Sequence, residues 1–267
     1  MVRAEFAPTH TLSTYITCLA AGPYHRVIDS WQGMELGLMC RQSLARYLDS
    51  DELFRLTKAG LEWLTANFGD YPWGVKYDQI FVPEYNLGAM ENPGLVTFTE
   101  HYLFRSPATP AQLQGRANTL VHEMSHMWFG DLVTPRWWGD LWLKESFAEF
   151  MGSHISVEAC GFADGWVNFA TSRKVGAYLA DSMPTTHPVV ADIADLEAAI
   201  ALGLPSGTII APGSPAKFAV QVNEPASKAL VTRLRIVDFN GDVVADQHFP
   251  APRGREPSIV AVPMNIC

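Results

Sequence analysis

Two closely spaced histidines offer the clearest chemistry in the 267-residue sequence. His122 and His126 enclose Glu123 in the pattern His-Glu-x-x-His. On an α-helix, residues four apart lie on one face, so both imidazoles can bind one zinc ion at about 2 Å. Glu123 is rotated by about 100° from His122 and can contact a zinc-bound water instead. The alternative is a helix that carries two histidines by chance, and the pattern would arise somewhere in a chain of this composition with a chance of roughly one in a hundred.

Two histidines do not complete a catalytic zinc site, which commonly has three protein ligands and a water. Glu145 and Glu149 lie one helical turn apart in the next apolar segment. Either carboxylate could reach the ion on geometry alone. A solvated acidic helix face is the alternative for this pair.

The segment that leads into the histidines predicts a long, buried helix. Thr109, Pro110 and Gln112 form a helix-start pattern, with a capping hydroxyl, a proline in the first turn and a glutamine three residues after the cap. Apolar residues then recur at helical spacing up to Trp128, and Gly130 is typical of a helix end. Two imidazoles and a carboxylate on a buried helix are costly without partners, and a metal ion would supply one.

Shorter patterns predict the other elements of an α+β fold. β-prone runs bounded by proline and glycine predict strands over residues 77–82 and 95–99. An apolar run predicts a further strand over residues 14–21. Helices are expected over residues 141–160 and 163–183, because glycine or proline follows each apolar-periodic segment.

The chain changes character near residue 200. All eight tryptophans and all eight tyrosines come before residue 179. Residues 201–267 instead show alternating apolar and polar residues, and Asn240 followed by Gly241 is a strong hairpin signal. We therefore expect a short β-rich tail of unknown origin over residues 201–267.

Composition excludes several classes of protein. A content of 48% hydrophobic and 18% charged residues excludes disorder, and no apolar run approaches the ~20 residues of a membrane-spanning helix. The net charge of −9 disfavours nucleic acid and anionic membranes as partners. Four scattered cysteines without a Cys-x-x-Cys pair favour a reducing, cytoplasmic compartment over a disulfide framework or a thiolate zinc site.

These motifs resemble a known family. His-Glu-x-x-His, followed after 18 residues by Glu145, is similar to the gluzincin pattern of the M1 family of aminopeptidase N-like zinc aminopeptidases. The segment 88–92, Gly-Ala-Met-Glu-Asn, resembles that family's exopeptidase motif, and Trp-Phe-Gly-Asp at 128–131 resembles the segment that follows the histidines. The similarity covers about residues 6–196. It implies a thermolysin-like catalytic domain, a small β-sheet followed by helices, that is incomplete and spans residues 25–200, preceded over residues 1–24 by the end of an N-terminal β-domain.

The resemblance also implies a role for each matching residue. The zinc ligands would be His122, His126 and Glu145, and Glu123 would be the general base in hydrolysis of peptides that have a free N-terminus. Glu91 would bind the α-amine of the substrate, so that only the first peptide bond meets the metal. The substrate-binding segment would comprise Gly88, Ala89, Met90, Glu91 and Asn92.

The chain departs from the family pattern in three ways. The Tyr-x-Lys-Gly segment that supplies an oxyanion donor does not occur, and loss of one such donor commonly costs ~100- to 1000-fold in turnover. We also expect the long helical C-terminal region to be missing. Lys144 stands where the family usually has asparagine. A zinc- or peptide-binding remnant without turnover is therefore the alternative to an active aminopeptidase, and a third reading makes the tail an interaction module.

Two further carboxylates are candidates for supporting roles. Asp131 and Asp140 could each accept the second ring N–H of a ligand histidine. A capping or surface role is equally compatible with the sequence at both positions. The oligomeric state leaves no signal in the sequence.

Overall fold

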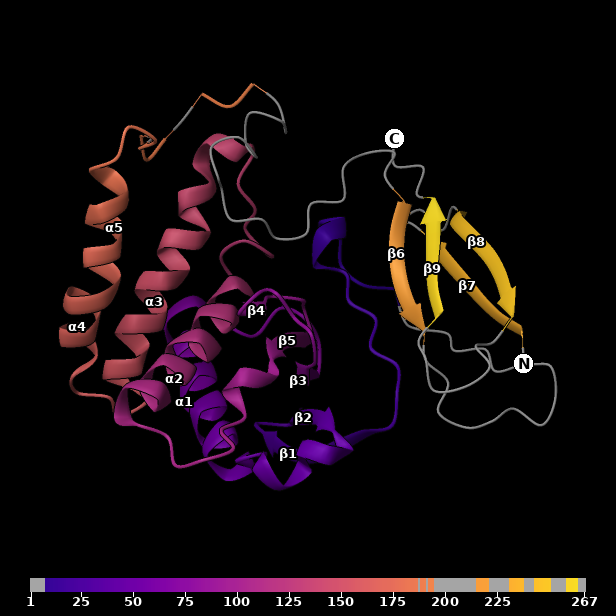
Figure 1. Cartoon of the computed structure of the whole chain (residues 1–267), viewed down its shortest axis with the longest axis horizontal. Coiled ribbons are helices and arrows are strands. Elements are labelled where there is room, and N and C mark those ends of the chain that lie inside the picture. Colours follow the sequence, from indigo (N-terminus) through magenta and orange to yellow (C-terminus); the bar gives the residue numbers. More distant parts are fainter. Residues whose placement is uncertain are drawn as a thin grey trace. The chain divides into compact units, whose positions relative to one another are not determined.

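The computed structural model describes residues 8–186, 188–190 and 192–194, together with the backbone of four strands between residues 215 and 263. The chain divides into two compact units (Figure 1). The larger unit is Tyr24–Gly207, and the smaller combines Met1–Pro23 with Thr208–Cys267. Every residue to which the sequence assigns chemistry lies in the larger unit.

A mixed five-stranded sheet forms the base of the larger unit, with strand order β1-β2-β3-β5-β4. The pairs β1–β2 and β4–β5 are antiparallel, whereas β2–β3 and β3–β5 are parallel. Gln32 and Gly33 both have positive φ in the turn between β1 and β2, as a tight hairpin requires. The two strands predicted over residues 77–82 and 95–99 are confirmed. The strands are β1 (Tyr24–Trp31), β2 (Met34–Arg41), β3 (Lys76–Val82), β4 (Ala89–Met90) and β5 (Leu95–Thr99).

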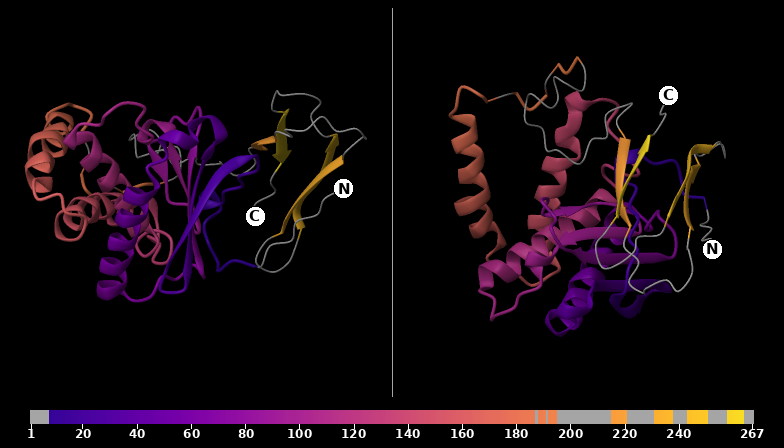
Figure 2. Two further views of the ribbon diagram at one scale, coloured as in Figure 1. Left: turned by 90° about the horizontal axis from the view of Figure 1, so that it is seen from below. Right: turned by 45° about the vertical axis from the view of Figure 1, so that its right-hand side comes forward.

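Helix α1 (Ser50–Phe68) connects β2 to the parallel strand β3, as a parallel pair requires. This helix was not predicted from the sequence, although four leucines recur along it on one face and are all fully buried: Leu53, Leu56, Leu61 and Leu64. Full burial of one such leucine stabilises the fold by roughly 1.5–3 kcal/mol. The helices α1, α2 and α3 gather on one side of the sheet (Figure 2).

Helix α2 (Pro110–His126) carries the histidines and begins as predicted. The hydroxyl of Thr109 accepts a hydrogen bond from the backbone N–H of Gln112, and Oε1 of the Gln112 side chain accepts one from the backbone N–H of Thr109. The helix ends at His126, earlier than the expected stop at Gly130. The Gly130 N–H donates to the Val133 carbonyl, and the His126 carbonyl accepts from Asp131 instead.

The two later helices differ from the expected bounds mainly at their starts. Helix α3 (Glu145–Glu158) begins after a 3-10 helix, whereas the sequence predicted one helix from residue 141. The helix expected over residues 163–183 is confirmed as a continuous run of α4 (Gly165–Asn168), a π-helical turn η5 (Phe169–Arg173) and α5 (Lys174–Asp181). The 3-10 helices of the larger unit are η2 (Gln42–Tyr47), η3 (Glu100–Tyr102) and η4 (Trp138–Leu143).

The predicted strand over residues 14–21 is wrong. This segment contains the 3-10 helix η1 (Thr14–Ile16), in which the Thr17 N–H donates to the Thr14 carbonyl. These local bonds satisfy backbone groups that a strand would have paired with a neighbour.

Four strands form two antiparallel pairs in the smaller unit, in agreement with the alternating pattern of the tail. β6 (Pro215–Val220) pairs with β9 (Ser258–Pro263), and β7 (Val231–Val237) pairs with β8 (Val243–Pro250). The expected turn at Asn240 and Gly241 lies outside the described residues.

Cys18, Cys40 and Cys160 are free thiols. Within the described part of the chain, none of the helices combines the length and the apolar character that crossing a bilayer requires.

Candidate metal centre and active site

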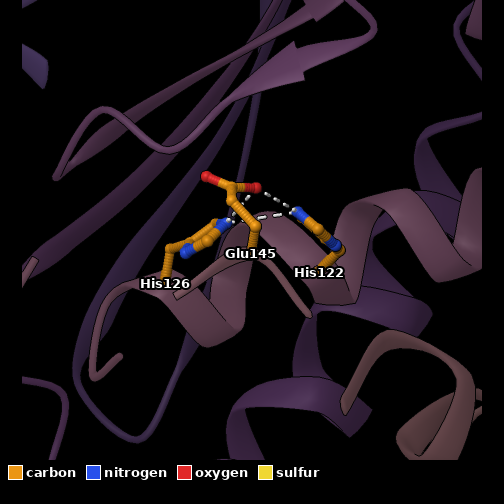
Figure 3. A group of neighbouring side chains, drawn as sticks. All are labelled: His122, His126 and Glu145. Carbon is orange, nitrogen blue, oxygen red and sulfur yellow. Dashed lines mark hydrogen bonds and ion pairs between the residues drawn. The ribbon is translucent and has the colours of Figure 1, made fainter. Parts of the chain in front are cut away.

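Helix α2 aims both histidines at one point (Figure 3). The Nε2 atoms of His122 and His126 lie 3.1 Å apart, and the Oε2 atom of Glu145 lies 3.7 Å from each. The point equidistant from three atoms so placed is about 2 Å from each of them, which is the length of a zinc–nitrogen or zinc–carboxylate bond. The donor set of two imidazoles and one carboxylate therefore fits a zinc ion in both chemistry and spacing.

Close packing of α3 against α2 brings Glu145 to the histidines. A side-chain Cβ at Gly152 of α3 would lie 2.7 Å from Nδ2 of Asn118 and 2.8 Å from its backbone oxygen. Only glycine allows the two helices to approach this closely without displacement. The first residue of α3 can then meet side chains from the last turn of α2.

The structure separates the two carboxylates, Glu145 and Glu149, that helical spacing alone left open. Glu145 approaches the Nε2 atoms of both histidines, whereas Glu149 lies with its Oε2 atom 3.4 Å from Nδ1 of His122. Glu149 thus faces the side of the ring that points away from the common centre. The group of potential metal ligands contains Glu145 and not Glu149.

A backbone carbonyl fixes the orientation of His126. Its Nδ1 atom lies 3.0 Å from the carbonyl oxygen of Phe129, which can only accept a hydrogen bond. The proton is therefore on Nδ1, and Nε2 keeps a lone pair for a metal. Burial lowers the pKa of His126 to about 4, so that the neutral ring is the stable form at neutral pH.

His122 lies in a negative electrostatic environment. Burial disfavours its cationic form, but hydrogen bonds to Glu145 and Glu149 outweigh burial and raise its pKa to about 10. The same carboxylates would stabilise a divalent cation at the common centre. Burial opposes ionisation of Glu145 too, but the hydrogen bond from His122 and the charges of His126 and Lys144 lower its pKa below the usual range.

Glu123 has the properties of a proton acceptor. Its side chain is only 6% exposed, and burial raises its pKa to about 8, against the opposing charge of His122. A carboxylate with a pKa near neutrality is well matched to moving protons at physiological pH.

The segment 88–92 follows the edge of the sheet next to α2. Glu91 is 4% exposed, and its carboxylate lies within the same group of potential ligand atoms as Glu123 and His126, all within 4.8 Å of one another. Asn92 is buried and accepts a hydrogen bond from the hydroxyl of Thr97. Met90 is buried and Ala89 packs against the core, so these two side chains anchor strand β4.

Gly88 lies where the protein leaves space. Its carbonyl accepts a hydrogen bond from the Thr99 N–H, and an added Cβ would meet only the Tyr102 hydroxyl at 3.7 Å. The chain's own packing therefore does not require glycine at this position.

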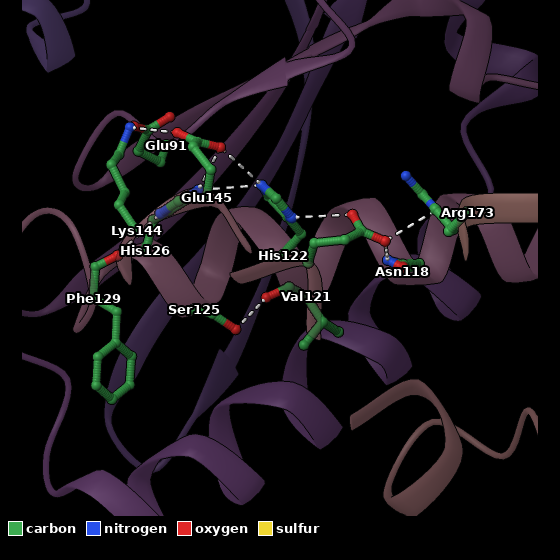
Figure 4. A network of polar contacts seen from close by, with 11 residues as sticks. Glu91, Asn118, Val121, His122, Ser125, His126, Phe129, Lys144, Glu145 and Arg173 are labelled. Atoms are coloured by element: carbon green, nitrogen blue, oxygen red, sulfur yellow. Dashed lines mark hydrogen bonds and ion pairs between the residues drawn. The ribbon is translucent and has the colours of Figure 1, made fainter. Parts of the chain in front are cut away.

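Lys144 joins the amine-binding candidate to the metal-binding candidate (Figure 4). Its ammonium group contacts Oε1 of Glu91 and lies 2.8 Å from Oε1 of Glu145, and the lysine side chain is only 8% exposed. A Cβ at Gly130 would lie 2.8 Å from Cγ of Lys144 and 3.1 Å from Nδ1 of His126, and Gly130 has φ of 127°. Glycine is thus required there by both space and backbone conformation.

The charges around Glu91 keep its carboxylate ionised. Burial would raise the pKa of Glu91, but the positive charges of His126, when protonated, and of Lys144 outweigh burial and lower it. From the sequence, Lys144 was noted only as a departure from the usual asparagine, because its partner Glu91 lies far away along the chain.

Neither proposed supporting aspartate contacts a ligand histidine through its side chain in the described structure. Both carboxylate oxygens of Asp131 are buried without a hydrogen-bond partner among the described residues, and burial raises the pKa of Asp131 to about 9. Asp140 lies in η4 and its N–H donates to the Trp137 carbonyl. The groups that do contact the second ring nitrogens are Glu149 and the Phe129 carbonyl.

Comparison with known proteins agrees with this arrangement. Residues 54–200, more than half of the chain, match the family description "Peptidase family M1 domain". The chain is 48% identical over 200 residues to aminopeptidase N of Streptomyces lividans, a match that covers 72% of this chain and 23% of that protein. It is 36% identical over 196 residues to Tricorn protease-interacting factor F2 of Thermoplasma acidophilum, covering 72% of this chain and 24% of that protein.

A mammalian aminopeptidase is similar to the chain over a region of about the same length. Aminopeptidase N of Mus musculus is 33% identical over 192 residues, which cover 69% of this chain and 20% of that protein. The chain thus spans about a quarter of the length of the curated relatives that it matches. The matched region contains the histidine pair, Glu145 and the segment 88–92, and the chain belongs to peptidase family M1.

Proposed function

We propose that this chain contains the metal centre of a zinc-dependent aminopeptidase that hydrolyses N-terminal amino acids from peptides. The observation that carries the proposal is the convergence of His122, His126 and Glu145 on a point about 2 Å from each donor atom. The names of the relatives, two of them aminopeptidase N, support the same activity. Zinc is the metal that best suits two imidazoles and one carboxylate in a hydrolytic site.

Each residue around that point has a part in the proposed reaction. His122, His126 and Glu145 would hold the ion, which supplies Lewis-acid chemistry that makes water more acidic. Glu123 accepts the proton from the attacking water and returns it to the amine of the leaving peptide. The raised pKa of Glu123, about 8, suits both transfers.

Glu91 is proposed to anchor the free α-ammonium group of the substrate. Its ionised carboxylate is buried at the end of the edge strand, within 4.8 Å of ligand atoms of the metal-centre residues. A cation bound there would set the distance from the N-terminus to the metal, so that only the first peptide bond is positioned for attack. Gly88 and Ala89 leave room for the substrate backbone beside the strand, while Met90 and Asn92 hold the strand in place.

The proposal also includes a fold and a division of the chain into domains. We infer a thermolysin-like catalytic domain over residues 25–200, in which an edge strand lies beside the helix that carries the histidines. Residues 1–24 would be the end of an N-terminal β-domain, and residues 201–267 a β-rich segment of unknown role. The cytoplasmic compartment stays a prediction from the cysteine pattern.

A zinc- or peptide-binding remnant without turnover is the second candidate. It is favoured by one sequence observation, the absence of a Tyr-x-Lys-Gly segment. Tyr178, the last tyrosine before the tail, lies on α5 with 61% of its surface exposed.

One experiment tests the proposal and separates the two candidates. Zinc content and hydrolysis of a chromogenic aminoacyl amide are measured for the chain, for Glu123→Gln and for a control, Glu158→Gln, at an exposed position of α3. An active aminopeptidase binds one zinc in all three proteins and loses turnover only in Glu123→Gln. Stoichiometric zinc with equal rates in all three would identify the remnant, and absence of zinc binding would refute both the aminopeptidase and a remnant that binds zinc.

A further inference from the structure

We propose that Arg173, on the π-helical turn η5, is a positioning residue for the metal centre and acts through Glu149. The guanidinium Nε of Arg173 lies 2.9 Å from Oε1 of Glu149, and the other oxygen of that carboxylate lies 3.4 Å from Nδ1 of His122. A chain of contacts therefore runs from η5, between α4 and α5, through Glu149 of α3 to the imidazole of His122 on α2. This inference rests on the proposed zinc site.

Glu145 and Glu149 contact opposite nitrogens of the same imidazole. They lie one turn apart on α3, and their Oε2 atoms approach Nε2 and Nδ1 of His122 at 3.7 and 3.4 Å. A carboxylate at Nδ1 favours the tautomer that carries the proton on that atom, which leaves Nε2 free to bind a metal. Glu149 therefore orients the ring of His122 and favours the proton on its Nδ1 atom, as the Phe129 carbonyl does for His126.

The two histidines differ in how firmly they are held. The ring of His126 is 1% exposed, and a backbone carbonyl accepts its hydrogen bond. The ring of His122 is 17% exposed, and its partner is a flexible glutamate side chain that is itself 26% exposed. A glutamate in this position orients the ring only if something restricts its own rotamers.

Arg173 supplies that restriction, together with Asn118. Nδ2 of Asn118 lies 3.4 Å from the same Oε1 atom that Arg173 contacts (Figure 4). One oxygen of Glu149 is thus held by α2 and η5, which directs the other oxygen to His122. The aliphatic stem of arginine and its planar head make this a directional contact.

The π-helical turn places Arg173 correctly because the helix around it is anchored at its start. Asn168 donates a hydrogen bond to Gln114 of α2 at 3.2 Å. Gly165 lies so close to α3 that a Cβ would meet Cγ2 of Val157 at 2.5 Å. A π-turn shifts the side chains that follow it relative to a regular α-helix, and such turns are frequent at functional sites. The helix therefore contributes to the site although no residue of it would touch the metal.

Zinc affinity of the full chain tests the inference directly. The dissociation constant is measured by competition with a chromogenic chelator for the unchanged chain, Glu149→Gln, Arg173→Gln and the double variant. Loss of such a partner typically weakens metal binding ~10- to 100-fold, and we expect this for Glu149→Gln. Arg173→Gln should weaken binding in the same direction by at most as much, and the double variant should match Glu149→Gln alone, because Arg173 acts through Glu149.

Controls separate this role from general loss of structure. Lys174→Gln, at the next residue on the surface of the same helix, should leave zinc affinity unchanged, and Arg173→Lys should recover part of it. The absorption spectrum of the Co²⁺-loaded chain should change in Glu149→Gln and Arg173→Gln but not in Lys174→Gln, since it reports ligand geometry. Circular dichroism checks that each variant is folded.

The zinc-binding measurements distinguish failure of this inference from failure of the proposed function. If the unchanged chain binds zinc, His122→Ala abolishes binding and Arg173→Gln binds as tightly as the unchanged chain, the proposed site stands and this inference fails. An Arg173 effect that adds in full to that of Glu149→Gln would also overturn it. If the unchanged chain does not bind zinc, the proposed function fails and this inference fails with it.

Discussion

Lys144 and Glu91 form an ion pair in the interior of the larger unit, with side chains only 8% and 5% exposed. Glu91 follows the edge strand β4, and Lys144 immediately precedes α3, so the pair ties the sheet to the helix that supplies Glu145. The lysine ammonium also lies 2.8 Å from Oε1 of Glu145, the carboxylate proposed to bind the metal. One buried cation thus fixes both acidic groups relative to each other.

Replacement of Lys144 by methionine should destabilise the fold strongly. Methionine has similar length but leaves the Glu91 carboxylate without its buried cation, and breaking a buried pair costs ~3–5 kcal/mol. Urea unfolding of the zinc-free chain measures the change, with Lys58→Met as a control, since Lys58 pairs with Asp29 and is 35% exposed. Equal losses in the two variants would contradict the importance of the interior pair.

Replacement of Gly152 by alanine should separate α3 from α2. The new Cβ would meet the Asn118 backbone oxygen at 2.8 Å, which a rotamer change cannot relieve. Overpacking of this kind costs ~1–3 kcal/mol, and displacement of α3 moves Glu145 away from the histidines, so zinc affinity should fall as well. Gly176→Ala on α5 is the matched control, because nothing lies within 4 Å of its added Cβ. That control should gain ~0.5–1 kcal/mol, and a gain at Gly152 too would refute the account of helix packing.

The fold and the site differ in how far the sequence reveals them. The capping pattern at Thr109 is local and was predicted correctly, and the spacing of His122 and His126 is local as well. Helical spacing left Glu145 and Glu149 open, because the choice depends on how α3 packs against α2, and only the family resemblance assigned Glu145. Arg173 was missed for the same reason, because its partner is brought near by tertiary packing.

The ends of helices and the short 3-10 helices were harder to predict, because local backbone hydrogen bonds compete there with those of regular helices and strands. The 3-10 helix η1 replaces the strand expected over residues 14–21, since that segment satisfies its own backbone groups. Helix α2 ends at His126 because the Gly130 N–H bonds to Val133. Family resemblance assigned the residues of segment 88–92, whose composition alone is typical of a surface turn.

The stability of the zinc-free chain should fall with rising pH through Asp131. Its folded-state pKa is raised from 3.8 to about 9, mainly by burial. A raised pKa means that the stabilisation by the protonated carboxyl is complete below about pH 4 and is lost as pH rises through about 9. Asp131→Asn should keep the neutral form, so its free energy of unfolding relative to the unchanged chain should rise by up to about 1.4 kcal/mol per pH unit between pH 5 and 8. Parallel pH profiles of the two proteins would refute this prediction.

Replacement of Glu91 by glutamine should remove discrimination for a free amino terminus. The neutral amide keeps the shape of the side chain but cannot pair with an ammonium group. The ratio of kcat/KM for a free peptide to that for its N-acetylated form should fall at least ~10-fold, while zinc content stays at one ion per chain. Glu84→Gln, in the loop before the segment, serves as the control. An unchanged ratio in Glu91→Gln would assign amine recognition to another group.

X-ray absorption at the zinc edge of the loaded chain tests the metal centre most directly. The structure predicts two imidazole nitrogens and at least one carboxylate oxygen at ~2.0–2.2 Å, with the imidazole signal halved in His122→Ala and the zinc content reduced in Glu145→Ala. A spectrum dominated by sulfur at ~2.3 Å, or one that His122→Ala leaves unchanged, would contradict it.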